Sequence, residues 1–318
     1  MPQVVRPAGG PLLPGVGTGD VFVRSATEIF RVELATGRVT RTLTPRLAQF
    51  SSFVAGPGWV VSKAVDTNAG VVVRNGQPAT ALPQGLQPTG RLDTAPGGQL
   101  WFTPEEETRG VRLVRRVGID GRPLEQPPIR LPDEVGSLSA DGAGYLIRAE
   151  AGGVFQYRPS GARRVASGDL IAVGARFLLV WDCDERCDPY RATRADDSRT
   201  KLAAARQYLR RSEQRAAVQS SFYGELSPDG THVVVPAPAD PNRWSISVLD
   251  LRTGTATEIP LADSNLNTLY AWTANTRWLL AITDDQLRAY DTKTRTTRTI
   301  ALTTEPLLHL TRVGAAGN

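Results

Sequence analysis

Apolar and polar positions along the chain repeat in one fixed order. The stretches 32–43 (VELATGRVTRTL), 248–259 (VLDLRTGTATEI) and 290–300 (YDTKTRTTRTI) each consist of an apolar strand, a turn at Thr-Gly or Thr-Arg, and a second strand. Alternation of polar and apolar residues is typical of a β-strand with one wet face, and Thr favours strands. The repeated Thr and Arg positions therefore predict a half-exposed outer strand after each turn.

The turns of this repeat lie at near-regular intervals. Successive turns are separated by 39, 45, 40, 37, 56 and 41 residues, which average 43. A period in the forties, built of four short strands, is typical of a β-propeller blade. The residues that mark the turns are Gly37, Gly76, Gly121, Gly161, Ser198, Gly254 and Arg295.

A second series of turns has the same phase. Turns of the type Pro-Gly, Pro-Asp-Gly or Ala-Asn precede an aromatic or apolar strand, each ahead of one mark of the first series. Two series in phase predict four strands a, b, c and d in each blade. The second series lies at 55–61, 95–102, 139–147, 173–180, 227–235 and 273–280.

The two ends of the repeat region complement one another. The stretch 20–25 (DVFVRS) reads as a strand b without a strand a, and 307–313 (LLHLTRV) is left over after the last strand d. Pairing the two would close the ring and remove its open edges. We therefore expect an all-β, seven-bladed β-propeller over 20–313, with a linker at 1–19 and a tail at 314–318.

The long interval of 56 residues contains an insertion at 205–219 (ARQYLRRSEQRAAVQ). Arg206/Arg210 and Arg211/Arg215 have i,i+4 spacing, which is compatible with a short helix. A loop is equally compatible with this sequence. Exposed ion pairs stabilise little, so we expect the segment to be the most mobile part of the ring.

Two stretches carry a resemblance to a known family. LSPDGTHVVV (226–235) together with VLDLRTG (248–254) resembles the TolB-like and WD-repeat-like propeller repeats of bacterial cell-envelope proteins. The Gly-His and Trp-Asp marks of true WD repeats are absent. The resemblance implies a propeller that acts outside the cytoplasm as a binding or scaffold module.

Composition and charge argue against several classes of binding partner. The chain has 318 residues and a formal net charge of +5, and Lys occurs only at 63, 201 and 293. Basic and aromatic residues are not interleaved, so we expect no nucleic acid. No run of about 18 apolar residues exists, so we expect no membrane span. The Pro/Gly-rich start (MPQVVRPAGGPLLPGVGTGD) lacks a signal peptide's apolar region and is typical of a linker after a signal or anchor segment.

The cysteines form a single close pair. Cys183 and Cys187, in WDCDERCDPY, lie in the expected b–c connection of the fifth blade, where their Cα atoms can come within disulfide range. We favour a disulfide, with free thiols as the alternative. No further Cys or His lies nearby to complete a zinc site, and the acidic residues lack the Gly of an EF-hand loop.

The charged residues are expected to separate between the two faces of the ring. The b–c loops and d–a connections share one face and are acidic, with Glu150, Asp133, Glu134, Asp263 and Glu305 among their residues. Candidate binding residues are Asp66, Glu105, Glu106, Glu107, Asp182, Asp184, Glu185, Asp188, Asp240, Asp284 and Asp285, with Arg206, Arg210, Arg211 and Arg215 of the insertion. The opposite turns carry Arg38, Arg122, Arg163, Arg164, Arg176, Arg199, Arg252, Arg277 and Arg295.

The two histidines give little support for catalysis. His232 occupies the position that Trp59, Tyr145 and Trp278 hold at the start of other strands b, which indicates a packing role. His309 lies on the closing strand, beside the expected channel, where an acid–base residue would be useful. No catalytic motif accompanies it.

Two classes of function remain. The first is a non-catalytic, monomeric binding or scaffold propeller for a protein, peptide or saccharide of the cell envelope, without cofactor or metal. The alternative is a propeller enzyme, a lyase or hydrolase, with its site at the channel mouth near His309. We favour binding, since propellers host both and no catalytic constellation is visible.

Overall fold

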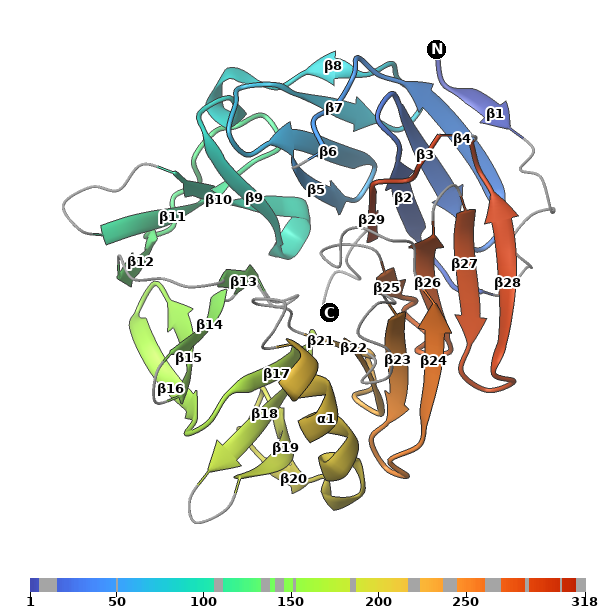
Figure 1. Cartoon of the computed structure of the whole chain (residues 1–318). Helices are drawn as coiled ribbons and strands as arrows, with labels where there is room; N and C mark the ends of the chain where they lie inside the picture. The colour runs from blue at the N-terminus through green and yellow to red at the C-terminus, as the bar shows by residue number, and fades with distance from the viewer. Residues whose placement is uncertain are drawn as a thin grey trace. The chain divides into compact units, whose positions relative to one another are not determined.

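The computed structural model shows an almost entirely β protein (Figure 1). The chain divides into two compact units. The first unit combines Met1–Asp133 with Thr268–Asn318, and the second is Glu134–Asn267. The structure describes residues 1–5, 16–49, 51–105, 111–132, 138–140, 146–150, 153–183, 187–216, 224–236, 245–260, 270–283, 286–303 and 305–312.

The described residues of the first unit form four antiparallel sheets and two 3-10 turns. In hydrogen-bonded order the strands are β1 (Gln3–Val5), β4 (Arg38–Leu43), β3 (Glu28–Glu33), β2 (Asp20–Arg24) and β29 (His309–Arg312); β5 (Ser51–Gly56), β6 (Trp59–Ala64), β7 (Gly70–Arg74) and β8 (Thr80–Ala81); β12 (Ile129–Pro132), β11 (Val111–Val117), β10 (Gln99–Pro104) and β9 (Gly90–Ala95); and β25 (Tyr270–Trp272), β26 (Trp278–Thr283), β27 (Gln286–Asp291) and β28 (Thr296–Ala301). The 3-10 turns are η1 (Gln84–Leu86) and η2 (Pro96–Gly98).

The second unit contains one four-stranded and one eight-stranded sheet. The eight-stranded sheet is two antiparallel groups joined by a parallel pairing of β17 with β21, where Ala172 lies opposite Gly224. The strands are β13 (Leu138–Ala140), β14 (Leu146–Glu150), β15 (Gly153–Arg158) and β16 (Gly161–Ala166); and β20 (Arg199–Lys201), β19 (Cys187–Thr193), β18 (Phe177–Cys183), β17 (Leu170–Val173), β21 (Gly224–Leu226), β22 (His232–Pro236), β23 (Ser245–Asp250) and β24 (Ala256–Pro260). The prediction of four-stranded antiparallel groups is confirmed.

Burial explains the two kinds of strand in the sequence. All six residues of β6 are buried, because an inner strand is covered on both faces. The first four residues of β28 are exposed, and only Ile300 of that strand is buried. The Thr and Arg residues of β28 therefore lie on a solvent-exposed outer strand, as predicted. In β4, whose edge is covered by β1, Thr40 and Arg41 are partly buried and Thr42 is buried.

The turn marks have a common backbone conformation. Gly37, Gly76, Gly121, Gly161 and Gly254 all have positive φ, and Arg295 does so at 58°. In the fifth repeat the positive φ belongs to Asp197 and not to the expected Ser198. Asp tolerates this left-handed region better than most residues, because its short side chain bonds to nearby backbone.

The C-terminal strand β29 pairs antiparallel with β2, with Val23 opposite Leu310. The connection before it is held by Glu305, whose carboxylate accepts hydrogen bonds from Ser25 Oγ and Thr27 Oγ1, both at 3.0 Å. Residues about 280 positions apart are thereby joined in the first unit.

The expected linker at 1–19 contains structure of its own. Gln3–Val5 form β1, which adds a fifth strand to the outer edge of β4. Val16 is fully buried. The sequence showed neither feature, because a three-residue strand has no periodicity to read.

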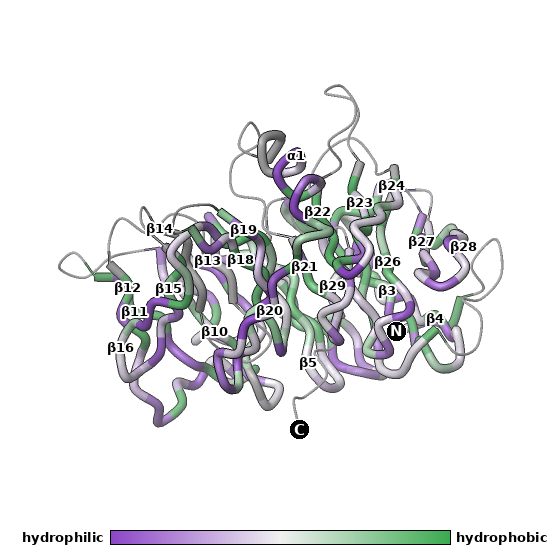
Figure 2. Tube along the Cα trace, turned by 90° about the horizontal axis from the view of Figure 1, so that it is seen from below, coloured by the Kyte–Doolittle hydropathy of each residue, from purple (hydrophilic) through white to green (hydrophobic). Residues whose placement is uncertain are grey.

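The apolar cores lie between neighbouring groups of strands. In the first unit, Phe22 and Ile29 of one sheet pack with Phe53 and Val60 of the next. In the second unit one cluster includes Trp181, Val233 and residues that follow β20. Figure 2 shows hydrophilic colouring along the outer strand β20 and on part of the helix that follows it.

Candidate functional site at the disulfide hairpin

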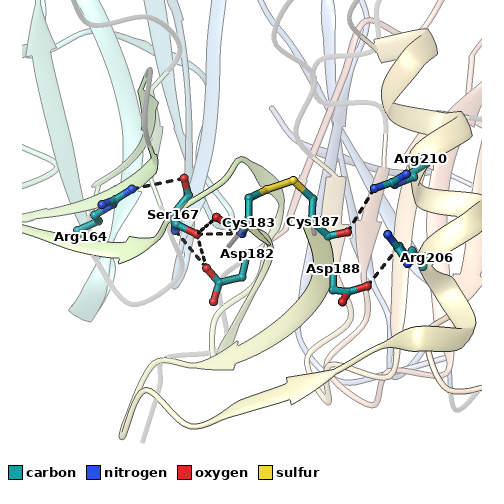
Figure 3. The surroundings of a disulfide bond; sticks show 8 residues. All are labelled: Arg164, Ser167, Asp182, Cys183, Cys187, Asp188, Arg206 and Arg210. Atoms are coloured by element: carbon teal, nitrogen blue, oxygen red, sulfur yellow. Dashed lines mark hydrogen bonds and ion pairs between the residues drawn. A yellow bond between two sulfur atoms is a disulfide. The ribbon is translucent and has the colours of Figure 1, made fainter. Parts of the chain in front are cut away.

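The tip of the β18–β19 hairpin carries the disulfide. Cys183 and Cys187 lie directly opposite one another, with Cα atoms 4.0 Å apart, and their sulfur atoms are bonded. The predicted disulfide is confirmed. It fixes the end of the hairpin, around which charged side chains from four elements gather (Figure 3).

Asp182, beside Cys183, is fully engaged within the protein. Its carboxylate accepts a hydrogen bond from Ser167 Oγ and forms an ion pair with Arg199. Burial raises the pKa of Asp182, but the bonds from Ser167 and the charge of Arg199 outweigh burial and hold that pKa below its usual value. Asp182 is thus a fixed, internally balanced anion.

Asp188, beside Cys187, is balanced in the same way. Lys201 Nζ lies 2.5 Å from one carboxylate oxygen and Arg206 Nε 3.2 Å from the other. Only 12% of the Asp188 side chain is exposed. The acidic surface expected around the cysteines is therefore neutralised at both described carboxylates.

The expected separation of charge between two faces does not hold at this hairpin. Arg199 was assigned to the basic face and Asp182 to the acidic one, yet they form an ion pair. An arginine side chain is long and flexible, so Arg199 of β20 reaches the carboxylate of Asp182 on β18, which lies beyond β19 in the sheet.

The insertion after β20 is helical. A 3-10 turn η3 (Ala203–Ala205) leads into α1 (Arg206–Ala216), which settles the open choice between helix and loop. Ala205 is fully buried and Leu209 is 1% exposed, and both pack in the core cluster with Trp181 and Leu251. The expected mobility of 205–219 was argued from its charges alone, whereas an apolar stripe packs the described part into the core.

Polar contacts add to this anchoring. Tyr208 Oη donates a hydrogen bond to Ser247 Oγ at 2.6 Å. The Arg210 guanidinium lies 5.9 Å from the centre of the Trp181 ring, and its Nη2 is 3.4 Å from the Cys187 carbonyl oxygen. Arg210 therefore joins the helix to the disulfide while remaining exposed.

One side of α1 presents basic groups to solvent. Arg210 and Arg211 are exposed, whereas Leu209 and Ser212 are buried. The α1 arginine face, defined here as Arg210 and Arg211, is thus carried by a helix with a packed underside. Arg215 lies in the same helix, but its side chain is outside the described residues.

The remaining predicted residues fall elsewhere. Asp66 and Glu105 belong to the first unit and are exposed. Glu106, Glu107, Asp184, Glu185, Asp240, Asp284 and Asp285 lie outside the described residues.

Two buried cations of the first unit were missed by the sequence reasoning. Lys63 donates to the carbonyl oxygens of Ala64 and Gly90, at 2.9 and 3.0 Å. Burial lowers the pKa of Lys63, although the charges of Asp66 and Glu105 raise it. Arg24, likewise at the end of a strand b, donates to Ala48 O and to Ser51 Oγ, each at 2.7 Å. These cations join neighbouring sheets, so their role is structural.

His309 is a packed residue. It is 9% exposed, its ring centre lies 6.2 Å from that of Phe53, and its Nε2 is 2.8 Å from the Gln49 carbonyl oxygen. A carbonyl only accepts, so Nε2 carries a proton. Burial, with help from the charge of Arg24, lowers the pKa of His309 to about 4. Such an imidazole is neutral at pH 7 and poorly placed to reach a substrate.

The pKa of His309 predicts how stability depends on pH. The free energy of unfolding should fall as pH drops from 6.5 towards 4, because the unfolded chain takes up a proton that the folded imidazole does not. Above pH 6.5 this contribution should be fully present. Urea unfolding across that interval would measure the slope, and His309→Gln should reduce it, leaving the part that His232, whose pKa is also lowered by burial, contributes. An unchanged slope in the variant would contradict the assignment.

Neither a metal-binding cluster nor a membrane-spanning helix is found among the described residues. No group of three or more His, Cys, Asp or Glu side chains in this part of the chain is arranged to hold a metal ion. None of its helices has the length and apolar character needed to cross a membrane.

Comparison with known proteins shows the fold. No protein-family model matches the sequence, and no curated protein matches it. A "putative 6-phosphogluconolactonase" from Bacteroides fragilis NCTC 9343 aligns with a TM-score of 0.52 and 16% identity, over 93% of this chain and 98% of its own. A Synechocystis apocarotenoid oxygenase mutant aligns at 0.54 and 9%, over 99% and 96%. TolB from Acinetobacter baumannii aligns at 0.49 and 12%, over 95% and 68%. The chain thus has a fold similar to β-propeller-type proteins.

Proposed function

We propose that the chain is a single seven-bladed β-propeller over 20–313, of the TolB-like type, and that it works outside the cytoplasm as a non-catalytic binding or scaffold module. Seven groups of strands support the blade number, with the eight-stranded sheet divided at its parallel β17–β21 contact. The pairing of β29 with β2 supports closure by the C-terminal strand.

The observation that carries the binding role is the α1 arginine face. Arg210 and Arg211 are exposed on a helix whose underside is packed in the core and whose neighbour is pinned by a disulfide. Cations on a rigid support lose little entropy on binding, and such fields steer partners of opposite charge. The partner is therefore an anionic protein, peptide or saccharide surface.

The disulfide also supports the location. Disulfides persist in oxidising compartments and are rare in the reducing cytosol. Both cysteines of this chain are used in one bond. The proposal accordingly places the protein outside the cytoplasm of a bacterium, with its partner in the cell envelope.

A charge-replacement experiment tests this function. Immobilised protein would be exposed to envelope extract, and the bound partners eluted with increasing salt. The double variant Arg210→Ser/Arg211→Ser should lose the salt-sensitive partners. Its thermal midpoint should fall only slightly, because the contacts of Arg210 with Trp181 and Cys187 O are made by an exposed side chain and contribute little. The matched control is Arg38→Ser/Arg74→Ser, two exposed arginines of the first unit. Equal retention of partners by both double variants would refute the α1 arginine face as the binding surface.

A further inference from the structure

A pocket of about 520 Å³ lies within the second unit, apart from the α1 arginine face. One wall is β20 with the start of η3, and the other is made by the turns at 230–232 and 250–252. Its volume falls in the range of small-molecule sites, roughly 300–1,000 Å³. The pocket is lined by both apolar and charged groups, and these residues indicate which class of ligand would bind.

Arg191 supplies a positive charge to the pocket. Its Nη1 donates to the Gly230 carbonyl oxygen at 3.0 Å, and its guanidinium lies 4.9 Å from the centre of the Phe177 ring. The buried Nε of Arg191 has no hydrogen-bond partner among the described residues. No carboxylate in that part of the chain pairs with this guanidinium, which is therefore held in place but not neutralised.

Arg252 supplies a second positive charge. Its backbone amide donates to Asp250 Oδ1 at 2.8 Å, which orients the turn, while its side chain is exposed. No carboxylate of the described residues forms an ion pair with it. The remaining cation, Lys201, is already paired with Asp188 outside the pocket.

Two further titratable groups face the pocket. Asp250 is turned towards backbone amides, since Oδ1 also accepts from the amide of Thr253 at 3.1 Å. Thr231 Oγ1 donates to Asp229 at 2.8 Å, so His232 Nδ1, 2.8 Å from the same hydroxyl, must donate to it. Burial lowers the pKa of His232, although Asp250 and Asp229 raise it, so the imidazole is neutral at pH 7. The positive charge of Arg191 and Arg252 therefore exceeds the negative charge of Asp250 in the pocket.

The rest of the lining is apolar. Leu202 and Leu251 are buried, and the methyl groups of Ala203 and Ala204 complete that side. A hydrated inorganic ion would leave this wall uncovered. A molecule with an anionic head and a short hydrocarbon body would satisfy both parts of the lining.

We propose that this pocket binds a small organic oxyanion, a carboxylate or a phosphate monoester, whose head group is held by Arg191 and Arg252 and whose apolar body lies on Leu202 and Leu251. Guanidinium groups form paired hydrogen bonds with both kinds of head group. The site requires neither the α1 arginine face nor a protein partner. A ligand here would stabilise the folded state in proportion to its concentration over its Kd.

The test is titration of the full chain with hexanoate, hexyl phosphate, inorganic phosphate and hexanamide, followed by calorimetry and by the shift in thermal midpoint. We expect saturable binding of hexanoate or hexyl phosphate, with the preferred one distinguishing a carboxylate from a phosphate ligand. Hexanamide, equal in shape and uncharged, should not bind. Inorganic phosphate should bind more weakly than hexyl phosphate. Absence of saturable binding by both organic anions, or equal binding of hexanamide, would overturn the proposal.

Variants assign the binding to these residues. Arg252→Ser, at an exposed position that leaves the fold intact, should weaken the affinity about tenfold or more, as loss of a charge-assisted hydrogen bond does. Arg191→Lys should also weaken it, because a lysine cannot form the paired contact. The matched control, Arg176→Gln, replaces an exposed turn arginine of the same unit outside the pocket. Equal losses in Arg176→Gln and Arg252→Ser would overturn the site. The imidazole signal of His232 should shift on binding in the wild type, and its failure to move would likewise count against this pocket.

Discussion

Replacing Leu209 with Ala should lower the free energy of unfolding by about 3 kcal/mol, as truncation of a fully buried leucine usually does. Leu209 is 1% exposed and packs with Trp181 and Leu251, so the lost methyl groups would leave a cavity between two groups of strands. Urea unfolding would measure the change. We expect the thermal midpoint to fall with it.

The matched control for this experiment is Arg211→Ala in the same helix. Arg211 is exposed, and its truncation should change the free energy of unfolding by no more than about 0.5 kcal/mol. Similar small losses in both variants would mean that α1 is dispensable for stability. The packed helix would then be a surface appendage, and the α1 arginine face would lose its rigid support.

Ending the chain at Pro306, which removes β29, should give an insoluble or oligomeric product. Leu307 and Leu310 are 7% and 2% exposed, and β2 would lose one of its two antiparallel partners and become an edge strand. A strand edge with free N–H and C=O groups pairs readily with other molecules. Size-exclusion chromatography and the soluble yield would measure the effect.

Two comparisons sharpen this truncation. A chain that ends at Arg312 retains all of β29 and should behave as the full chain does. Glu305→Ala keeps the strand but removes the acceptor of Ser25 and Thr27, and should cost about 2 kcal/mol. A soluble monomer of unchanged thermal midpoint after truncation at Pro306 would refute the role of β29 in closing the fold.

The insertion at 205–219 has an apolar face that the sequence analysis did not identify. Leu202, Ala205 and Leu209 are spaced by three and four residues, which is the signal of a helix with one apolar face. The prediction for this segment rested on its four arginines and did not use the apolar stripe. Only the packing of that stripe shows that α1 is part of the core.

The buried positions of Arg24 and Lys63 were likewise not predicted from the sequence. Arg24 is the last residue of β2 and Lys63 the last but one of β6, and no local sequence feature indicates that either is buried. Most of their acceptors are backbone carbonyl oxygens, such as Ala48 O before β5 and Gly90 O of β9, and only Ser51 Oγ is a side-chain atom. Every residue has a backbone carbonyl group, so the sequence does not indicate which of them accepts a hydrogen bond. Such contacts can be identified only in the folded structure.

The sequence by itself determined the strand pattern, the turns and the disulfide. These are local properties: the side-chain period of two, the left-handed turn at residues such as Gly37, and the four-residue separation of Cys183 and Cys187. Tertiary structure alone decided which charges meet, how α1 packs and that a pocket exists between β20 and the turn at 250–252. Long side chains from elements far apart in the chain contact one another only in the folded structure. Which of them meet depends on three-dimensional distances that cannot be predicted from a local sequence pattern.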